Sequence, residues 1–220
     1  MSKESEMPPT IGEVFAGLKS ELTWAHGRWD LYRQLFLASE RRIALLNECA
    51  GVFFRVLQDV LLDDTALVLS KLGDPAKTFN KYPNLSFAQL EQRIIAHGDA
   101  QLSSNVQGLV AKYAAAIDTF KMWRDKRLAH LDLQTAITSP MPLPGITMGM
   151  IEAALDAATS ILNEVERHFD DATTLYRLFR LRGDADAMIG LLKGGLRYEQ
   201  LMQEGVIPFE DTERDPWAQA

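Results

Sequence analysis

The sequence has a single cysteine, Cys49, among its 220 residues. One cysteine excludes an intramolecular disulfide and any metal site built on paired cysteines. Because Cys49 falls inside an apolar helical pattern, we expect it to act as a small core residue. Strand signals are scarce as well, since there is no Asn-Gly hairpin and no sustained alternation of apolar and polar residues. The fold is therefore not expected to be built on sheets.

Long hydrophobic runs are also absent. No charge-free apolar run is long enough to span a membrane, and the N-terminal MSKESEMPPT has no apolar stretch after a basic head, so we expect a cytoplasmic protein without a membrane segment. The formal net charge of -7 argues against a surface built to coat nucleic acid. Any action on nucleic acid must then come from a confined site or from a partner.

Several chemistry-bearing motifs are missing. The sequence contains no glycine-rich phosphate loop and no Gly-x-Ser-x-Gly nucleophile elbow. It also lacks the Glu-x-x-His pairs of di-iron helical bundles, so we expect neither a metal nor a cofactor. These absences argue against the common hydrolase and nucleotide-binding classes.

What the sequence does have is helical periodicity along almost its whole length. This pattern predicts an all-α fold, an antiparallel bundle of about four long helices with short C-terminal helices. The long helices are expected over residues 11–37, 39–72, 104–131 and 147–182, with a short one over 86–96. Gly73-Asp74-Pro75 should end the second helix. We divide the chain into a bundle domain, residues 1–182, and a C-terminal appendage, residues 183–220, in which Gly194-Gly195 should separate two short helices.

The second long helix carries a near-heptad apolar stripe, which we expect to face the core: Ile43, Leu46, Ala50, Phe53, Leu57, Val60 and Leu67. Asp64 falls on the same stripe, where a buried carboxylate needs a partner. Arg124 or Arg127 from a neighbouring helix is the simplest candidate. The other interpretation is an ordinary core ion pair that fixes the helix register.

The helix over residues 104–131 turns from apolar to cationic at its end, where the heptad positions become Arg124 and Arg127. Burying an unpaired guanidinium is costly, so these side chains must meet acids, solvent or a phosphate. A helix end that protrudes into solvent accounts for them equally well. Arg124 and His130 lie about 120° apart on an ideal helix, too far to hold one phosphate together. Either the helix distorts near Leu128, or a twofold contact along it makes a composite site.

The segment MWRDKRLAHLD has an Arg followed six residues later by a His, with Asp125 directly after the Arg. This arrangement resembles the signature of the HEPN superfamily. Residues 29–208 resemble its abortive-infection AbiU-type family, through these segments: SERRIALLNECAGVFFRVLQDVLLDDTALVLSKLGDPAKT, ITMGMIEAALDAATSILNEVE and GDADAMIGLLKGGLRYEQL. The resemblance implies an all-α bundle that dimerises along the motif helix and cuts RNA without a metal. It gives Arg124 and His130 the catalytic positions and Asp125 the accompanying polar one.

The residue types suit such chemistry. A histidine can move protons between a ribose 2′-OH and the leaving 5′-oxygen, and an arginine can hold the phosphate. Arg127 and Asp64 are supporting residues that come from the periodicity and not from the family. We therefore expect a ribonuclease of a phage-defence or toxin-antitoxin system, with an antitoxin or defence protein as a further partner. The alternative is a non-catalytic HEPN module that holds a partner or acts as a scaffold.

Overall fold

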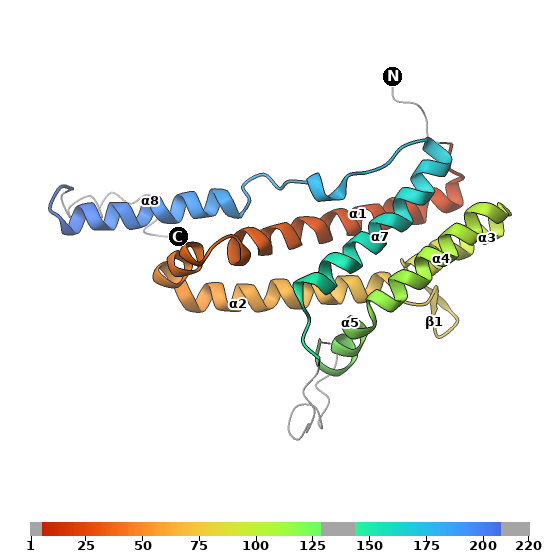
Figure 1. The fold of residues 1–220 in the computed structure, drawn as a ribbon, viewed down its shortest axis with the longest axis horizontal. Helices are drawn as coiled ribbons and strands as arrows, with labels where there is room; N and C mark the ends of the chain where they lie inside the picture. Colours follow the sequence, from red (N-terminus) through yellow and green to blue (C-terminus); the bar gives the residue numbers. More distant parts are fainter. Residues whose placement is uncertain (1–5, 129–143, 208–220) are drawn as a thin grey trace. The chain divides into compact units, whose positions relative to one another are not determined.

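The computed structural model describes residues 6–128 and 144–207, and within them the fold is all-α, as predicted (Figure 1). A short antiparallel pair, β1 (Lys77–Thr78) and β2 (Tyr82–Pro83), follows the second helix. The helices, in chain order, are α1 (Pro9–Tyr32), α2 (Glu40–Leu72), α3 (Phe87–His97), α4 (Ala100–Ala116), α5 (Asp118–Trp123), α7 (Met148–Asp170) and α8 (Ala185–Gln203), joined by the π-helical turns η1 (Arg33–Leu37) and η2 (Arg124–Leu128) and the 3₁₀ turn η3 (Tyr176–Leu178).

The chain divides into two compact units. Unit 1 comprises Met1–Asp30 and Asp59–Arg180, and unit 2 comprises Leu31–Gln58 and Leu181–Ala220. Both α1 and α2 contribute to the two units. Our division into a bundle domain, residues 1–182, and an appendage, residues 183–220, stays a prediction.

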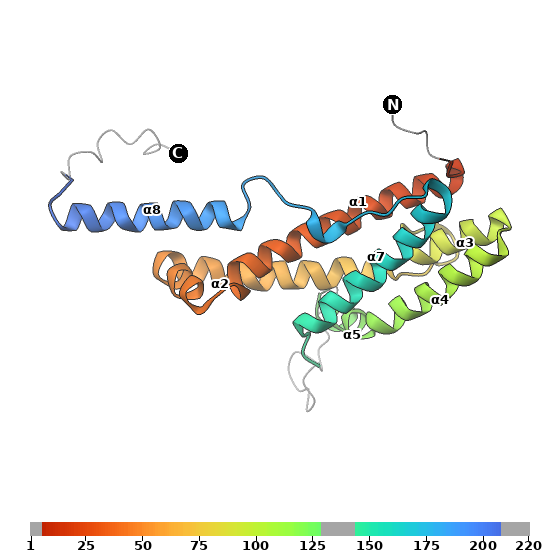
Figure 2. The same cartoon turned by 45° about the horizontal axis from the view of Figure 1, so that its top comes forward.

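Unit 1 is built around two helices that pack side by side, α4 and α7 (Figures 1 and 2). A turn at Gly98, whose φ of 93° suits glycine, joins α3 to α4, and the Asp99 side chain caps α4 by accepting a hydrogen bond from the Leu102 backbone. The core is formed by apolar side chains that are almost fully buried, among them Leu18, Leu22, Leu90, Ile94, Val106, Phe120, Ile151, Leu155, Leu162 and Val165.

Helix α7 begins where the sequence predicts, with Thr147 as its cap, but it ends at Asp170 and not at residue 182. Asp171 adopts a left-handed conformation with φ of 50°, which stops the helix. The Asn163 side chain then accepts a hydrogen bond from the Thr174 backbone N–H at 2.9 Å and holds the following segment against α7. Apolar periodicity alone did not reveal this stop.

In unit 2, α8 is one continuous helix, so the predicted break at Gly194-Gly195 is wrong. A glycine costs a helix only about 1 kcal/mol relative to alanine, and two of them do not interrupt it here. The Asp184 side chain caps the helix, and Arg42 binds Asp186 at 2.7 Å, which joins the start of α8 to the start of α2.

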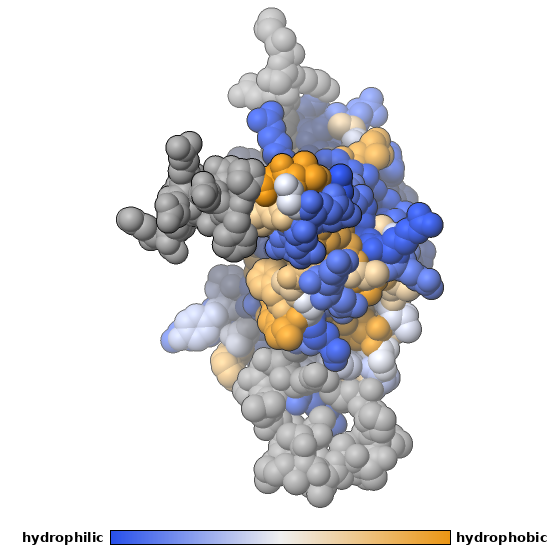
Figure 3. Space-filling model, turned by 90° about the vertical axis from the view of Figure 1, so that its left-hand side faces the viewer, coloured by the Kyte–Doolittle hydropathy of each residue, from blue (hydrophilic) through white to orange (hydrophobic). Residues whose placement is uncertain are grey.

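The apolar stripe of the second helix, which we expected to face the core, is only partly buried. Leu46 is 1% exposed, but Phe53 is 61% and Val60 is 56% exposed. Phe54, the residue after Phe53, is buried instead. Ala50, with φ of -164° and ψ of 63°, interrupts the helical conformation, so a single heptad phase does not continue through α2. Cys49 beside this interruption is half-buried. On the side of the molecule shown in Figure 3, hydrophobic side chains reach the surface between hydrophilic ones.

None of the helices in the described ranges combines the length and the apolar character needed to cross a membrane.

Candidate active site

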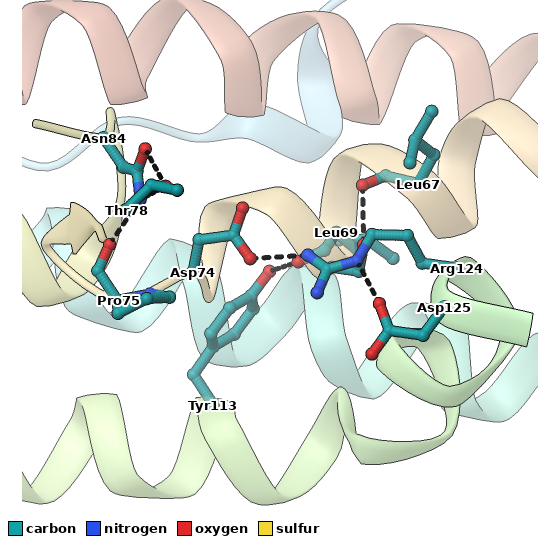
Figure 4. A network of polar contacts seen from close by, with 10 residues as sticks. Leu67, Leu69, Asp74, Pro75, Thr78, Asn84, Tyr113, Arg124 and Asp125 are labelled. Atoms are coloured by element: carbon teal, nitrogen blue, oxygen red, sulfur yellow. Dashed lines mark hydrogen bonds and ion pairs between the residues drawn. The ribbon is translucent and has the colours of Figure 1, made fainter. Parts of the chain in front are cut away.

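Arg124 is the first residue of η2, the π-helical turn that follows α5. Its Nη1 lies 2.5 Å from Oδ1 of Asp74, and its Nε donates to Oδ1 of Asp125 at 2.9 Å (Figure 4). The Arg124 side chain is 21% exposed, so most of it is withdrawn from solvent. Arg124, at the cationic end of the predicted stripe, therefore meets acids, one of the three environments that the sequence allowed.

The end of α2 brings Asp74 to this place. A Cβ atom on Gly73 would lie only 2.0 Å from Cδ1 of Ile117, so a glycine lets α2 approach the break between α4 and α5. From α4, the buried Tyr113 hydroxyl donates to the Leu69 carbonyl at 2.6 Å and fixes the last turn of α2. Asp74 is thus positioned by residues that precede α5, independently of the helix that carries Arg124.

The two carboxylates determine the electrostatics of the site. Burial lowers the pKa of the Arg124 guanidinium, but the hydrogen bonds and charges of Asp74 and Asp125 outweigh this effect and raise the pKa above its usual value. Burial raises the pKa of the Tyr113 phenol, and the negative charge of Asp74 raises it further. Arg124 is therefore charged and Tyr113 is a neutral donor at any physiological pH.

The described part of the motif helix, up to Leu128, is distorted, which was one of the two outcomes expected from the angle between Arg124 and His130. Ile117 leaves the helical conformation, with φ of -102° and ψ of 6°, and Arg124–Leu128 is π-helical. The angle of an ideal α-helix therefore does not apply to this segment. Such π-helical turns occur frequently at functional sites.

His130 and the side chain of Arg127 lie outside the described residues, so their predicted roles stay predictions. Described residues on either side of the segment with His130 are nevertheless held together, because Trp123 Nε1 donates to the Pro144 carbonyl at 2.6 Å. Asp125, the next residue in the chain, accepts a hydrogen bond from Arg124, and 63% of its side chain is exposed, while its predicted role stays a prediction.

Asp64 does not pair with Arg124, one of the two arginines that the sequence offered, and it is not in the core. It does form an ion pair, which was the other interpretation. Its partner is Arg28 on α1, and the Asp64 side chain is 39% exposed. The apolar stripe placed Asp64 inwards, but α1 runs beside this part of α2 and supplies a closer cation. Asp64 therefore does not contact Arg124, whose carboxylate partners are Asp74 and Asp125.

Sequence reasoning missed Asp74, because Gly73-Asp74-Pro75 was interpreted only as a helix stop. An acidic residue immediately after a long helix, in a chain with an otherwise unpaired arginine, was the signal that could have identified it. A cation held by two carboxylates can still offer its remaining N–H groups to a phosphate oxygen, which is the chemistry this arrangement allows.

A second polar cluster lies in unit 1 between α1, α7 and η3. His26 is 6% exposed, its Nε2 lies 3.1 Å from Thr159 Oγ1, and its ring stacks on Tyr176. Glu166, which is also buried, binds Lys19 and accepts a hydrogen bond from the Thr174 hydroxyl at 2.7 Å. His26 and Glu166 are each bonded within the cluster, which therefore holds the segment after α7 onto the bundle.

The family model HEPN_AbiU2, described as AbiU2, matches residues 9–188. No curated protein and no solved structure matches the chain. The matched range covers most of the chain and contains Asp74, Arg124, Asp125 and His130.

Proposed function

Since the chain belongs to the AbiU2 family of HEPN proteins, we propose that it is a metal-independent endoribonuclease of a bacterial phage-defence or toxin-antitoxin system. The observation that carries the proposal is the environment of Arg124. Its guanidinium is fixed at the start of a π-helical turn within the family match, with Nε and Nη1 held by carboxylates. A preorganised cation of this kind suits a phosphodiester.

In the proposed reaction, the ribose 2′-oxygen attacks the adjacent phosphorus and the bond from phosphorus to the 5′-oxygen breaks. His130 takes the proton from the 2′-OH and returns a proton to the leaving 5′-oxygen. Arg124 binds the phosphate oxygens and offsets the charge that develops on them. The products are a 2′,3′-cyclic phosphate and a free 5′-OH, and the proton count balances without any other reactant.

We also propose that the enzyme acts as a homodimer along the motif helix. This part rests on the family, because HEPN domains of the active type are expected to pair Arg and His residues across a twofold axis. An antitoxin or another defence protein would be a further partner.

The test is cleavage of RNA by the purified full-length protein, with and without EDTA. The variants Arg124→Ala and His130→Ala should each lower the rate by about 100-fold to 10,000-fold. Arg167→Ala and His168→Ala, which change the same residue types on α7, are the matched controls and should leave the rate unchanged. Activity that survives both motif substitutions, or that EDTA abolishes, contradicts the proposal.

The composite site has its own test. If each site takes Arg124 from one chain and His130 from the other, mixing the two inactive variants restores about a quarter of the wild-type activity, because half of the dimers are mixed and each has one intact site. Light scattering should show a dimer at micromolar concentration. No restored activity in the mixture, with dimers present, contradicts the composite site.

A second candidate is a non-catalytic scaffold, and the same ion pairs favour it. A guanidinium bound to two carboxylates resembles a structural salt bridge, which fixes a helix end without any reaction. Under this candidate the wild-type protein cuts no RNA, and Arg124→Ala lowers stability alone.

A further inference from the structure

Arg124 is held from two independent directions. Asp125 is its neighbour on the same turn, whereas Asp74 lies 50 residues earlier in the chain, directly after α2. Among the described residues, hydrogen bonds to Arg124 are made through Nε and Nη1, and none is found at Nη2. The two carboxylates therefore fix the plane of the guanidinium and leave the N–H groups of Nη2 for another acceptor.

Of these two carboxylates, Asp74 is better placed to hold the arginine. The Asp74 side chain is 28% exposed and that of Asp125 is 63% exposed. Solvent screens an ion pair less as its exposure falls, so the bond to Asp74 constrains Arg124 more strongly than the bond to Asp125.

Asp74 is itself rigidly supported. Its backbone N–H donates to the Lys71 carbonyl at 3.0 Å, and Pro75 follows directly, with its carbonyl accepting from the Asn84 side chain at 2.8 Å (Figure 4). The Thr78 hydroxyl bonds the same Asn84 side chain. The Asp74 carboxylate thus projects from a turn that is fixed on both sides, so it can hold the Arg124 side chain in one position.

We propose that Asp74 is a positioning residue, which holds Arg124 so that Nη2 faces the scissile phosphodiester of bound RNA. This inference rests on the proposed function. Asp74 and Asp125 together carry two negative charges against the single positive charge of Arg124. They must therefore weaken the attraction of the site for an RNA phosphate in the ground state while they improve the orientation of the arginine.

Removing Asp74 should separate these two effects. In Asp74→Ala, kcat for cleavage of a fluorescent RNA oligonucleotide should fall about 100-fold, because a displaced arginine no longer fits the transition state. KM should stay the same or fall, because one repelling charge is gone. Asp74→Glu, which keeps the carboxylate, should recover part of kcat. If Asp74 had only a structural role, Asp74→Ala would not lower kcat and KM together while the free energy of unfolding stayed unchanged.

Asp118→Ala is the matched control. It removes the same charge from the exposed first turn of α5, six residues before Arg124. Its kcat and KM should equal those of the wild type. Equal kinetic constants for Asp74→Ala and Asp118→Ala would overturn the proposal. A rise of kcat in Asp74→Ala would also overturn it, since Asp74 would then restrain the enzyme and not position it.

A measurement without RNA separates this inference from the proposed function. By heteronuclear NMR of arginine side chains, rotation of the Arg124 guanidinium should be hindered in the wild type and in Asp118→Ala and free in Asp74→Ala. Hindered rotation in Asp74→Ala would overturn the positioning role. If the wild type cuts no RNA, the proposed function fails, and a loss of hindrance in Asp74→Ala still shows that Asp74 fixes Arg124.

Discussion

Nε2 of His26 lies 3.1 Å from Oγ1 of Thr159, inside a cluster that leaves the histidine 6% exposed. Burial lowers the pKa of His26 to about 4, with a further lowering from the charge of Arg177. The unfolded chain, with an ordinary histidine pKa of about 6.5, therefore binds one more proton than the folded chain between these two values.

The first prediction follows from this proton difference. The contribution of neutral His26 to the free energy of unfolding is fully present above pH 6.5. It is lost as the pH falls towards 4, which lowers the stability by at most about 3 kcal/mol. Urea denaturation at a series of pH values should show that the free energy of unfolding depends less on pH in this window for His26→Gln than for the wild type. His168→Gln, which alters a half-exposed histidine on α7, should keep the wild-type dependence. Identical pH profiles for His26→Gln and the wild type contradict this account.

Gly73→Ala should destabilise the protein by about 1 to 3 kcal/mol, because the new methyl group overlaps the buried Ile117 side chain. The double variant Gly73→Ala/Ile117→Val removes the overlapping Cδ1 atom and should be more stable than the sum of its single changes allows. Gly108→Ala is the control, since a Cβ at that helical position meets no atom within 4 Å. Its stability, measured by thermal denaturation, should rise slightly. Strict additivity in the double variant would argue against the overlap.

The ion pair between Arg28 and Asp64 should contribute little to the stability of the fold. Its side chains are 27% and 39% exposed, so a double-mutant cycle should give a coupling energy below about 1 kcal/mol. The corresponding cycle between Asp64 and Arg124 should give none, because the two residues do not share a contact. Coupling between Asp64 and Arg124 would restore the partnership expected from the sequence.

Tyr113→Phe should cost about 1 to 2 kcal/mol, because it removes the buried hydrogen bond to the Leu69 carbonyl. Tyr82→Phe, at a residue that is 57% exposed, provides the comparison and should be neutral. Chemical denaturation followed by circular dichroism measures both. A neutral Tyr113→Phe would mean that the end of α2 is held by packing alone.

The fold class and most helix starts could be predicted because they depend on local signals. Ser86 and Thr147 cap the helices that begin directly after them, and Gly98, with a positive φ, ends α3. The early end of α7 could not, because Asp171 and the bond between Asn163 and Thr174 interrupt an apolar pattern that continues beyond them. The exposed Phe53 was missed because the interruption at Ala50 is marked only by the adjacent Gly51, and a single glycine inside a helical pattern does not by itself indicate a break.

The residues of the candidate site also differ in whether the sequence could identify them. Arg124 and Asp125 could be found from the motif, because they are adjacent in the chain. For Asp74 the sequence offered only a candidate acid after a long helix, because its contact with Arg124 depends on how closely α2 approaches the break at Ile117. An ion pair of Asp64 could be expected, but its partner Arg28 could not, because periodicity along α2 says nothing about which cation α1 places opposite it.

The π-helical turn Arg33–Leu37 at the end of α1 also determines where the chain can change in length. A π-helical turn holds one residue more than the α-helical turn it replaces. Deleting one residue from Arg33–Leu37 would convert this turn to α-helix and keep the facing of the residues on both sides. The same deletion inside α1 would rotate everything beyond it by about 100°. Among homologues, single-residue deletions in this part of the chain should therefore concentrate in Arg33–Leu37.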